Sequence, residues 1–116
     1  MKFLLGIDVG SSSVKCALIS IDSGECVASA YSPSSEMQIL APQNGFAEQD
    51  PETWWRELHN AMAIIADECD FKKNDIAAIG ISYQMHGLVM VDKEGHSLRP
   101  SIIWCDSRAV EIGANA

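Results

Sequence analysis

The chain opens with an apolar strand that carries one carboxylate and runs into a glycine and serine turn before a second strand begins. This first strand is predicted over residues 3–9 and contains Asp8, and the turn is Gly10-Ser11-Ser12-Ser13. An ionised carboxylate inside an apolar strand is costly to desolvate unless a partner or a cation offsets its charge. The pattern therefore predicts a hairpin that holds phosphate and magnesium, with Asp8 binding the metal through water. An ordinary hairpin with a half-exposed Asp8 is the alternative interpretation.

The turn has the chemistry of an anion site. Gly10 lets the backbone approach a ligand closely, and the hydroxyls and successive N–H groups of Ser11, Ser12 and Ser13 can form an anion-binding concavity. Lys15 is expected to add positive charge nearby. Neither a G-x-x-x-x-G-K-[ST] motif nor a G-x-G-x-x-G motif occurs in the chain. A bound phosphate is therefore expected to be held by the hairpin.

The composition narrows the class of protein. With 116 residues, of which 47% are hydrophobic, the chain has enough apolar material for a single core. A formal net charge of -8 argues against nonspecific binding to nucleic acid or to an anionic membrane surface. The N-terminus starts like a signal peptide, but Asp8 interrupts the apolar run and no stretch of transmembrane length follows. We therefore expect a cytoplasmic protein.

The cysteines are far apart in the chain and form no C-x-x-C pair, so neither a zinc site nor a disulfide framework is indicated. We expect them to be buried, reduced thiols. They are Cys16, Cys26, Cys69 and Cys105.

Two further strands are predicted after the opening one. They cover residues 14–21 and 26–31, are joined by a turn at 22–25, and continue the first strand as an antiparallel meander. A polar loop is expected over residues 32–49.

A helix is predicted after this loop, because Asp50 can cap it and Pro51 suits its first position. Apolar residues then recur at helical spacing and predict a face that packs on the sheet: Trp54, Leu58, Ala61, Ile65 and Cys69. The apolar segment 76–82 predicts a strand covered on both faces, and the helical crossover makes it parallel to its partner. We therefore expect a mixed α/β sheet.

The remainder is predicted as a strand at 88–91, a hairpin-like turn at 93–96 and a short strand at 101–104. A last helix is expected to start at Ser107, with Asp106 as its cap, and to run to the end of the chain.

Gln84-Met85-His86-Gly87 stands where the strand 76–82 ends, a position at which α/β sheets commonly place ligand-contacting groups. Its side chains offer an amide, an apolar wall and an imidazole, and Gly87 permits a tight reversal. A solvated turn histidine is the alternative interpretation.

Trp104-Cys105-Asp106-Ser107-Arg108 likewise ends a strand and precedes a helix. An indole face stacks on the C–H side of a sugar, and charged groups hydrogen-bond neighbouring hydroxyls, so the segment suits a polyhydroxylated ligand. The alternative is a core Trp104 followed by a capping Asp106 that pairs locally with Arg108.

Four motifs taken in order resemble the N-terminal part of FGGY-family carbohydrate kinases, and within that family the Gln-Met-His-Gly run is most similar to xylulokinases. The motifs are Gly6-Ile7-Asp8-Val9-Gly10-Ser11-Ser12-Ser13-Val14-Lys15, Gly45-Phe46-Ala47-Glu48-Gln49-Asp50-Pro51-Glu52-Thr53-Trp54, Gly80-Ile81-Ser82-Tyr83-Gln84-Met85-His86-Gly87-Leu88-Val89 and Ile103-Trp104-Cys105-Asp106-Ser107-Arg108. The resemblance implies a ribonuclease-H-like core of the actin/hexokinase/Hsp70-type ATPase fold. Residues 1–116 are then expected to be an incomplete N-terminal, sugar-binding domain. The catalytic base and the ATP-binding C-terminal domain are expected to lie beyond it.

The resemblance also implies roles for individual residues. Asp8 becomes the carboxylate near Mg²⁺ and the transferred phosphoryl group, and the turn from Gly10 to Ser13, with Lys15 close by, becomes part of the phosphate region. The residues expected to contact the sugar are Met85, His86, Trp104 and Asp106. The chain departs from the family pattern at Cys105, where the family often has Asn.

Two hypotheses follow for function. The first is part of an ATP- and Mg²⁺-dependent pentulose kinase, with D-xylulose as substrate. Its partners are a sugar and ATP rather than nucleic acid or membrane, and a homodimer stays open. The second is a non-catalytic, nucleotide-switched binding or assembly module of the same fold, which has no need for the sugar-binding clusters at Met85-His86 and at Trp104 to Asp106.

Overall fold

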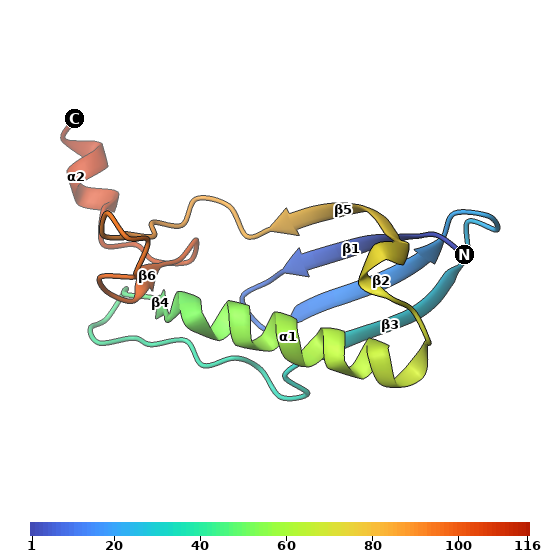
Figure 1. The fold of residues 1–116 in the computed structure, drawn as a ribbon. Helices are drawn as coiled ribbons and strands as arrows, with labels where there is room; N and C mark the ends of the chain where they lie inside the picture. The colour runs from blue at the N-terminus through green and yellow to red at the C-terminus, as the bar shows by residue number, and fades with distance from the viewer.

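The computed structural model describes residues 1–116 and contains the predicted meander. Strands β1 (Phe3–Val9), β2 (Val14–Ser20) and β3 (Cys26–Ser32) pair antiparallel, and β5 (Ile76–Tyr83) pairs parallel to β1. The sheet order is therefore β3-β2-β1-β5 (Figure 1). This confirms the mixed sheet and the parallel strand reached through a helical crossover.

Helix α1 (Pro51–Glu68) begins as predicted. Asp50 is its N-cap and accepts a 3.0 Å hydrogen bond from the Glu52 N–H, and Pro51 occupies the first helical position, where no N–H is needed. The helix lies along β2 and β3 (Figure 1).

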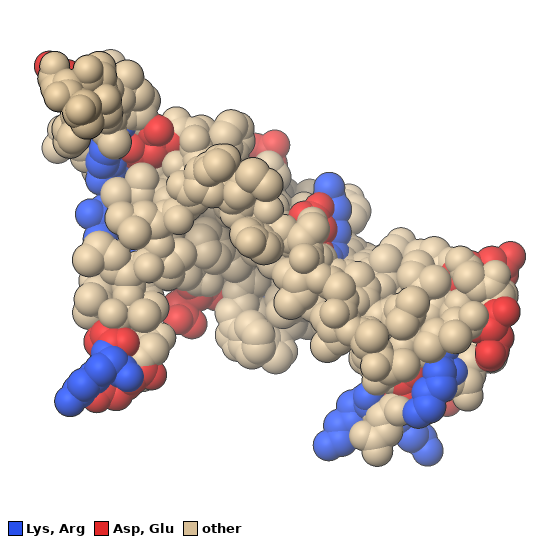
Figure 2. Space-filling view, turned by 90° about the horizontal axis from the view of Figure 1, so that it is seen from above, with Lys and Arg blue, Asp and Glu red and all other residues tan.

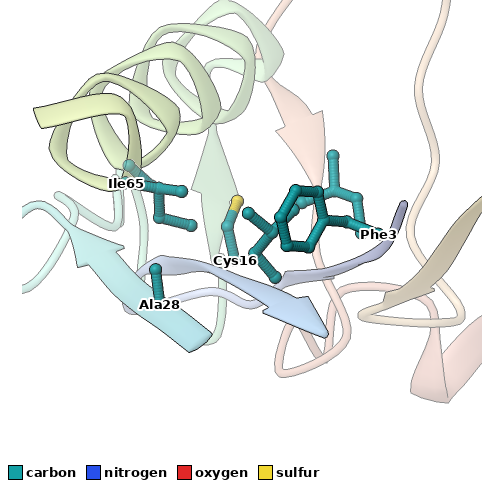
Figure 3. Packing of buried hydrophobic residues seen from close by; sticks show 7 residues of the cluster. Phe3, Cys16, Ala28 and Ile65 are labelled. Carbon is teal, nitrogen blue, oxygen red and sulfur yellow. The ribbon is translucent and has the colours of Figure 1, made fainter. Parts of the chain in front are cut away.

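The core lies between α1 and the sheet. Figure 3 shows Ile65 of the helix pointing toward Cys16 and Ala28 of the sheet, with Phe3 next to them. Burial raises the pKa of the Cys16 thiol and keeps it protonated. The full cluster is Phe3, Leu5, Cys16, Leu18, Ala28, Ala61 and Ile65. Cys16 is thus buried as expected, but the same expectation is wrong for Cys26 and Cys105, which are exposed.

Strand β5 is not covered on both faces, which corrects the prediction for residues 76–82. Ile79, Ile81 and Tyr83 are 57%, 63% and 68% exposed. The reason is geometric: β5 is the edge strand beyond β1, whereas α1 packs on β2 and β3 (Figure 1). The strand is apolar, but no other element of this chain packs over these side chains.

A second, smaller unit stands at the end of the molecule toward which β1 and β5 point (Figure 1). Its two-stranded sheet pairs β4 (Glu48–Gln49) with β6 (Ser101–Ile102), and helix α2 (Val110–Ala114) follows. A short 3₁₀ turn, η1 (Lys73–Asp75), precedes β5.

Three local predictions in this part differ from the structure. Residues 88–91 form isolated bridges at Leu88 and Val91 rather than a strand, and the strand predicted at 101–104 stops at Ile102. Helix α2 starts later than expected, with Ala109 as its N-cap. Asp106 does not cap it, because its carboxylate is used elsewhere. The turn at 93–96 is confirmed by the bridge from Val91 to Ser97.

The surface agrees with the composition. In the view of Figure 2 most of the visible surface is uncharged, and Lys and Arg form separate groups, one of them at the lower right, rather than a continuous basic stripe. No helix is both long enough and apolar enough to cross a membrane.

Candidate functional site

Asp8 lies at the carboxyl end of β1 on the sheet face opposite to α1. In the ladder it is paired with Lys15 of β2 and with Ser82 of β5, and Ser82 Oγ donates a 3.0 Å hydrogen bond to Asp8 Oδ1. Gly6 and Gly80 are paired next to them and carry no side chain. An open hollow of about 690 Å³ therefore runs along this face, lined among others by Gly6, Asp8, Lys15, Ala17, Gly80 and Ser82.

The turn of residues 10–13 is tight and favours glycine at its first position. The Gly10 N–H donates to the Ser13 carbonyl at 3.0 Å, and a Cβ on residue 10 would lie 3.0 Å from the same oxygen. The N–H groups of Ser11, Ser12 and Ser13 donate no hydrogen bond within the chain. These N–H groups are therefore available to an anion, and binding of phosphate by the turn stays a prediction.

The residues present fit a magnesium ion bound mainly by phosphate and water. No group of three or more His, Cys, Asp or Glu side chains converges anywhere in the structure, so an all-protein metal cage is excluded. Mg²⁺ is usually held by one or two carboxylates together with waters and substrate phosphates. Asp8 supplies one such exposed carboxylate beside the turn. Binding of the metal by Asp8 stays a prediction.

The segment after β5 forms a second hollow beside the turn. Met85 and His86 line a cavity of about 480 Å³ together with Trp54, Val9 and Ile103, among others. They also line an adjoining one of about 290 Å³ with Trp104. The Trp104 Nε1–H donates to Ser11 Oγ at 3.4 Å. The structure thus brings together Met85, His86 and Trp104 next to the turn.

His86 has a backbone conformation that few residues other than glycine adopt. Its φ is +66°, in the left-handed region, which is unusual for a residue with a side chain. Such strain is concentrated at ligand sites and switch regions, which agrees with a functional role for His86. Its side chain is exposed, so the solvated turn histidine stays the alternative interpretation. The next residue, Gly87, lies close to the chain of β6, since a Cβ there would be 3.4 Å from the Ile102 carbonyl oxygen.

Asp106 is not brought into this cavity. Its side chain is only 3% exposed and its oxygens accept hydrogen bonds from the Ala47 N–H at 2.7 Å and from Arg108 Nη2 at 2.8 Å. The hydrogen bonds from the Arg108 guanidinium hold the pKa of Asp106 well below its usual range. The local pairing with Arg108 is therefore the arrangement observed, and contact of Asp106 with a sugar stays a prediction.

Two buried polar residues of β4 were given no role by the sequence analysis. Glu48 receives two hydrogen bonds from Arg99 Nη2, at 2.7 and 2.9 Å, and its side chain is 8% exposed. Gln49 is 2% exposed and contacts the turn. Both residues stand in the second of the four motifs, but two adjacent polar residues before a helix cap are also typical of an exposed loop, so the sequence did not indicate their burial.

The chain is similar to a known protein family and to several characterised proteins. The model of the N-terminal domain of the FGGY family of carbohydrate kinases matches residues 3–115. The xylulose kinase of Staphylococcus xylosus is 38% identical over 108 residues, which are 93% of this chain and 21% of that protein.

Two solved structures from Lactobacillus acidophilus are also similar. A ligand-bound xylulose kinase has a TM-score of 0.85 at 31% identity, with 100% of this chain and 22% of that chain covered. A gluconate kinase gives the same TM-score and identity, with 99% and 22% covered. The chain thus spans about a fifth of the length of these relatives. The predicted ribonuclease-H-like, actin/hexokinase-type fold is confirmed by these sugar kinases and by the sheet order.

Proposed function

The chain belongs to the FGGY family of carbohydrate kinases, and from this membership we propose that it is the N-terminal part of an enzyme that phosphorylates D-xylulose to D-xylulose 5-phosphate with ATP. The observation that carries the proposal is the hydrogen bond of 3.4 Å that Trp104 Nε1–H donates to Ser11 Oγ. It joins the hollow lined by Met85 and His86 to the turn with free N–H groups. A sugar hydroxyl and a phosphoryl group can therefore be held side by side, which phosphoryl transfer requires.

D-Xylulose is preferred over other sugars because of the relatives. The curated protein from Staphylococcus xylosus and one of the two Lactobacillus acidophilus structures are named as xylulose kinases. The gluconate kinase has the same backbone similarity, so the overall fold does not decide between these substrates. The choice of D-xylulose therefore rests on these names and on the similarity of the Gln84-Met85-His86-Gly87 run to xylulokinases, and Met85, His86 and Trp104 are the side chains proposed to contact the sugar.

The proposed mechanism gives this chain the tasks of positioning and charge stabilisation. Bound ATP would supply the γ-phosphoryl group, and Mg²⁺ would neutralise part of its charge. The N–H groups of Ser11, Ser12 and Ser13 would hold the phosphoryl oxygens, and Asp8 would hold the metal through water. His86 hydrogen-bonds a sugar hydroxyl, and Trp104 stacks on the C–H face of the sugar. The base that takes the hydroxyl proton is proposed to lie in the part of the relatives that this chain does not span. Action in the cytoplasm is proposed with this activity.

The test is a coupled assay of ATP consumption by the full-length protein with D-xylulose, D-ribulose, gluconate and glycerol. We expect the highest kcat/KM with D-xylulose. A higher kcat/KM with gluconate would contradict D-xylulose as the substrate but would still support kinase activity. ATP binding without consumption in the presence of any sugar would favour the nucleotide-switched module.

A further inference from the structure

Three consecutive carbonyl oxygens of the turn accept hydrogen bonds from other segments of the chain. Gln84 Nε2 donates to the Gly10 carbonyl at 3.4 Å, and Gln49 Nε2 donates to the Ser11 carbonyl at 2.6 Å. The Met37 N–H donates to the Ser12 carbonyl at 2.8 Å. These three donors come from segments that are far apart in the sequence, so the turn is held by tertiary contacts.

Holding the carbonyl groups also sets the direction of the N–H groups. A trans peptide unit is planar and its C=O and N–H point to opposite sides. The peptide bonds of the turn are trans, since the only cis bond precedes Pro33. The captured carbonyls of Gly10, Ser11 and Ser12 therefore direct the N–H groups of the following residues away from the donors. These N–H groups are the ones without a partner in the chain.

Gln49 makes the shortest of the three contacts and has little freedom to change. Its side chain is among the largest that are fully buried, and its Oε1 accepts a 2.9 Å hydrogen bond from Trp54 Nε1. The same oxygen lies 3.4 Å from Gln84 Nε2. Rotating the amide by half a turn would put Oε1 against the Ser11 carbonyl and Nε2 against the Trp54 N–H. One orientation is therefore strongly favoured, because the other leaves buried polar groups facing like groups.

We propose that Gln49 is a positioning residue, which fixes the peptide unit between Ser11 and Ser12 so that the N–H groups of the turn face the phosphoryl donor. Gln49 does not touch the substrates itself. The inference rests on the proposed function, because it takes the phosphates of ATP as the ligand of the turn. Without the amide donor, the peptide unit can rotate and the anion site loses its alignment.

The test compares variants of the full-length protein. Gln49→Glu keeps the shape and the acceptor for Trp54, but places a carboxylate oxygen against the Ser11 carbonyl. Gln49→Asn shortens the side chain and withdraws the donor without adding charge, so it serves if Gln49→Glu does not fold. Glu57→Gln is the matched control, since Glu57 is also buried but is bonded to Ser32, Asn60 and Arg56 rather than to the turn.

We expect both Gln49 variants to bind MgATP at least about tenfold more weakly by calorimetry, and kcat to fall by about 100-fold. The KM for the sugar should stay near that of the parent, and Glu57→Gln should change neither ATP affinity nor kcat. Folded Gln49 variants that bind MgATP and turn over like the parent would overturn the proposal. So would equal losses of sugar and ATP binding, which indicate a general structural defect.

The outcomes also separate this inference from the proposed function. A parent that binds MgATP but phosphorylates no sugar, with binding lost in the Gln49 variants, would refute the kinase and retain the role of Gln49. If the parent phosphorylates D-xylulose and the Gln49 variants do so equally well, the proposed function is retained and the role of Gln49 is refuted. A parent that does not bind MgATP at all would overturn both.

Discussion

Ser82 Oγ donates a 3.0 Å hydrogen bond to Asp8 Oδ1, although 74 positions separate the two residues in the chain. The bond connects the carboxyl ends of the parallel strands β1 and β5 on the face that α1 leaves open. It occupies one oxygen of Asp8 and leaves the other without a partner in the chain. A carboxylate held in this way has a fixed direction and retains a free oxygen for a cation or its water shell.

The first prediction concerns Asp8. In the full-length protein, Asp8→Ala should lower kcat by about 100- to 1,000-fold, because its charge acts on the metal and the developing transition state. Sugar affinity should change far less. Ser82→Ala is the control: it removes the hydrogen bond but keeps the carboxylate, so its effect should be much smaller. Steady-state kinetics at saturating Mg²⁺ give the comparison, and equal kcat for Asp8→Ala and the parent would rule out this role.

The second prediction concerns His86, which combines a strained backbone with a position in the cavity. His86→Gly should relieve the strain and raise the melting temperature, because glycine adopts a positive φ without steric cost. It should also raise the KM for D-xylulose, by about 5- to 150-fold if the lost hydrogen bond is worth about 1–3 kcal/mol. The KM for ATP should change little. A more stable variant with unchanged sugar KM would leave the strain without a functional reason.

The third prediction uses the pairing of Asp106 with Arg108. The pKa of Asp106 is lowered on folding, so its contribution to stability is present above the ordinary Asp value, 3.8, and is lost as the pH falls below it. Asp106→Asn should therefore lower the melting temperature at pH 7 and make it less sensitive to pH below about 4. Melting curves from pH 2 to 7 for parent and variant measure this difference. The same acid sensitivity in both proteins would show that Asp106 does not contribute.

How much of the structure follows from the sequence depends on whether a feature is local. The cap at Asp50 and the hairpin around Gly10 were predicted correctly, because neighbouring residues determine them. The strand 76–82 was predicted correctly as parallel, but its burial was not, since burial depends on what lies over Ile79 and Ile81. Apolar residues in a segment indicate that a strand favours burial, but whether it is buried depends on which other elements pack against it.

The candidate site divides in the same way. Asp8, His86 and Trp104 could be proposed from their motifs, and the structure places His86 and Trp104 in one cavity. Gln49 could not, because its importance lies in contacts with Ser11, Trp54 and Gln84, which come from other parts of the chain. A sequence shows that a residue is polar, and only tertiary packing shows that it is buried and which groups it bonds.

The last prediction concerns the exposed side of β5. Ile79, Ile81 and Tyr83 lie on an edge strand, where exposed apolar side chains and unpaired backbone groups favour pairing with another chain. Residues 1–116 produced alone should therefore self-associate as concentration rises, as measured by analytical ultracentrifugation. Ile81→Lys should reduce this association, because a charge on an edge strand opposes pairing. Ile112→Lys is the matched control, since Ile112 is 73% exposed on α2, away from the sheet. If both variants associate like the parent, or if the parent stays monomeric, β5 is not the surface through which the chains associate.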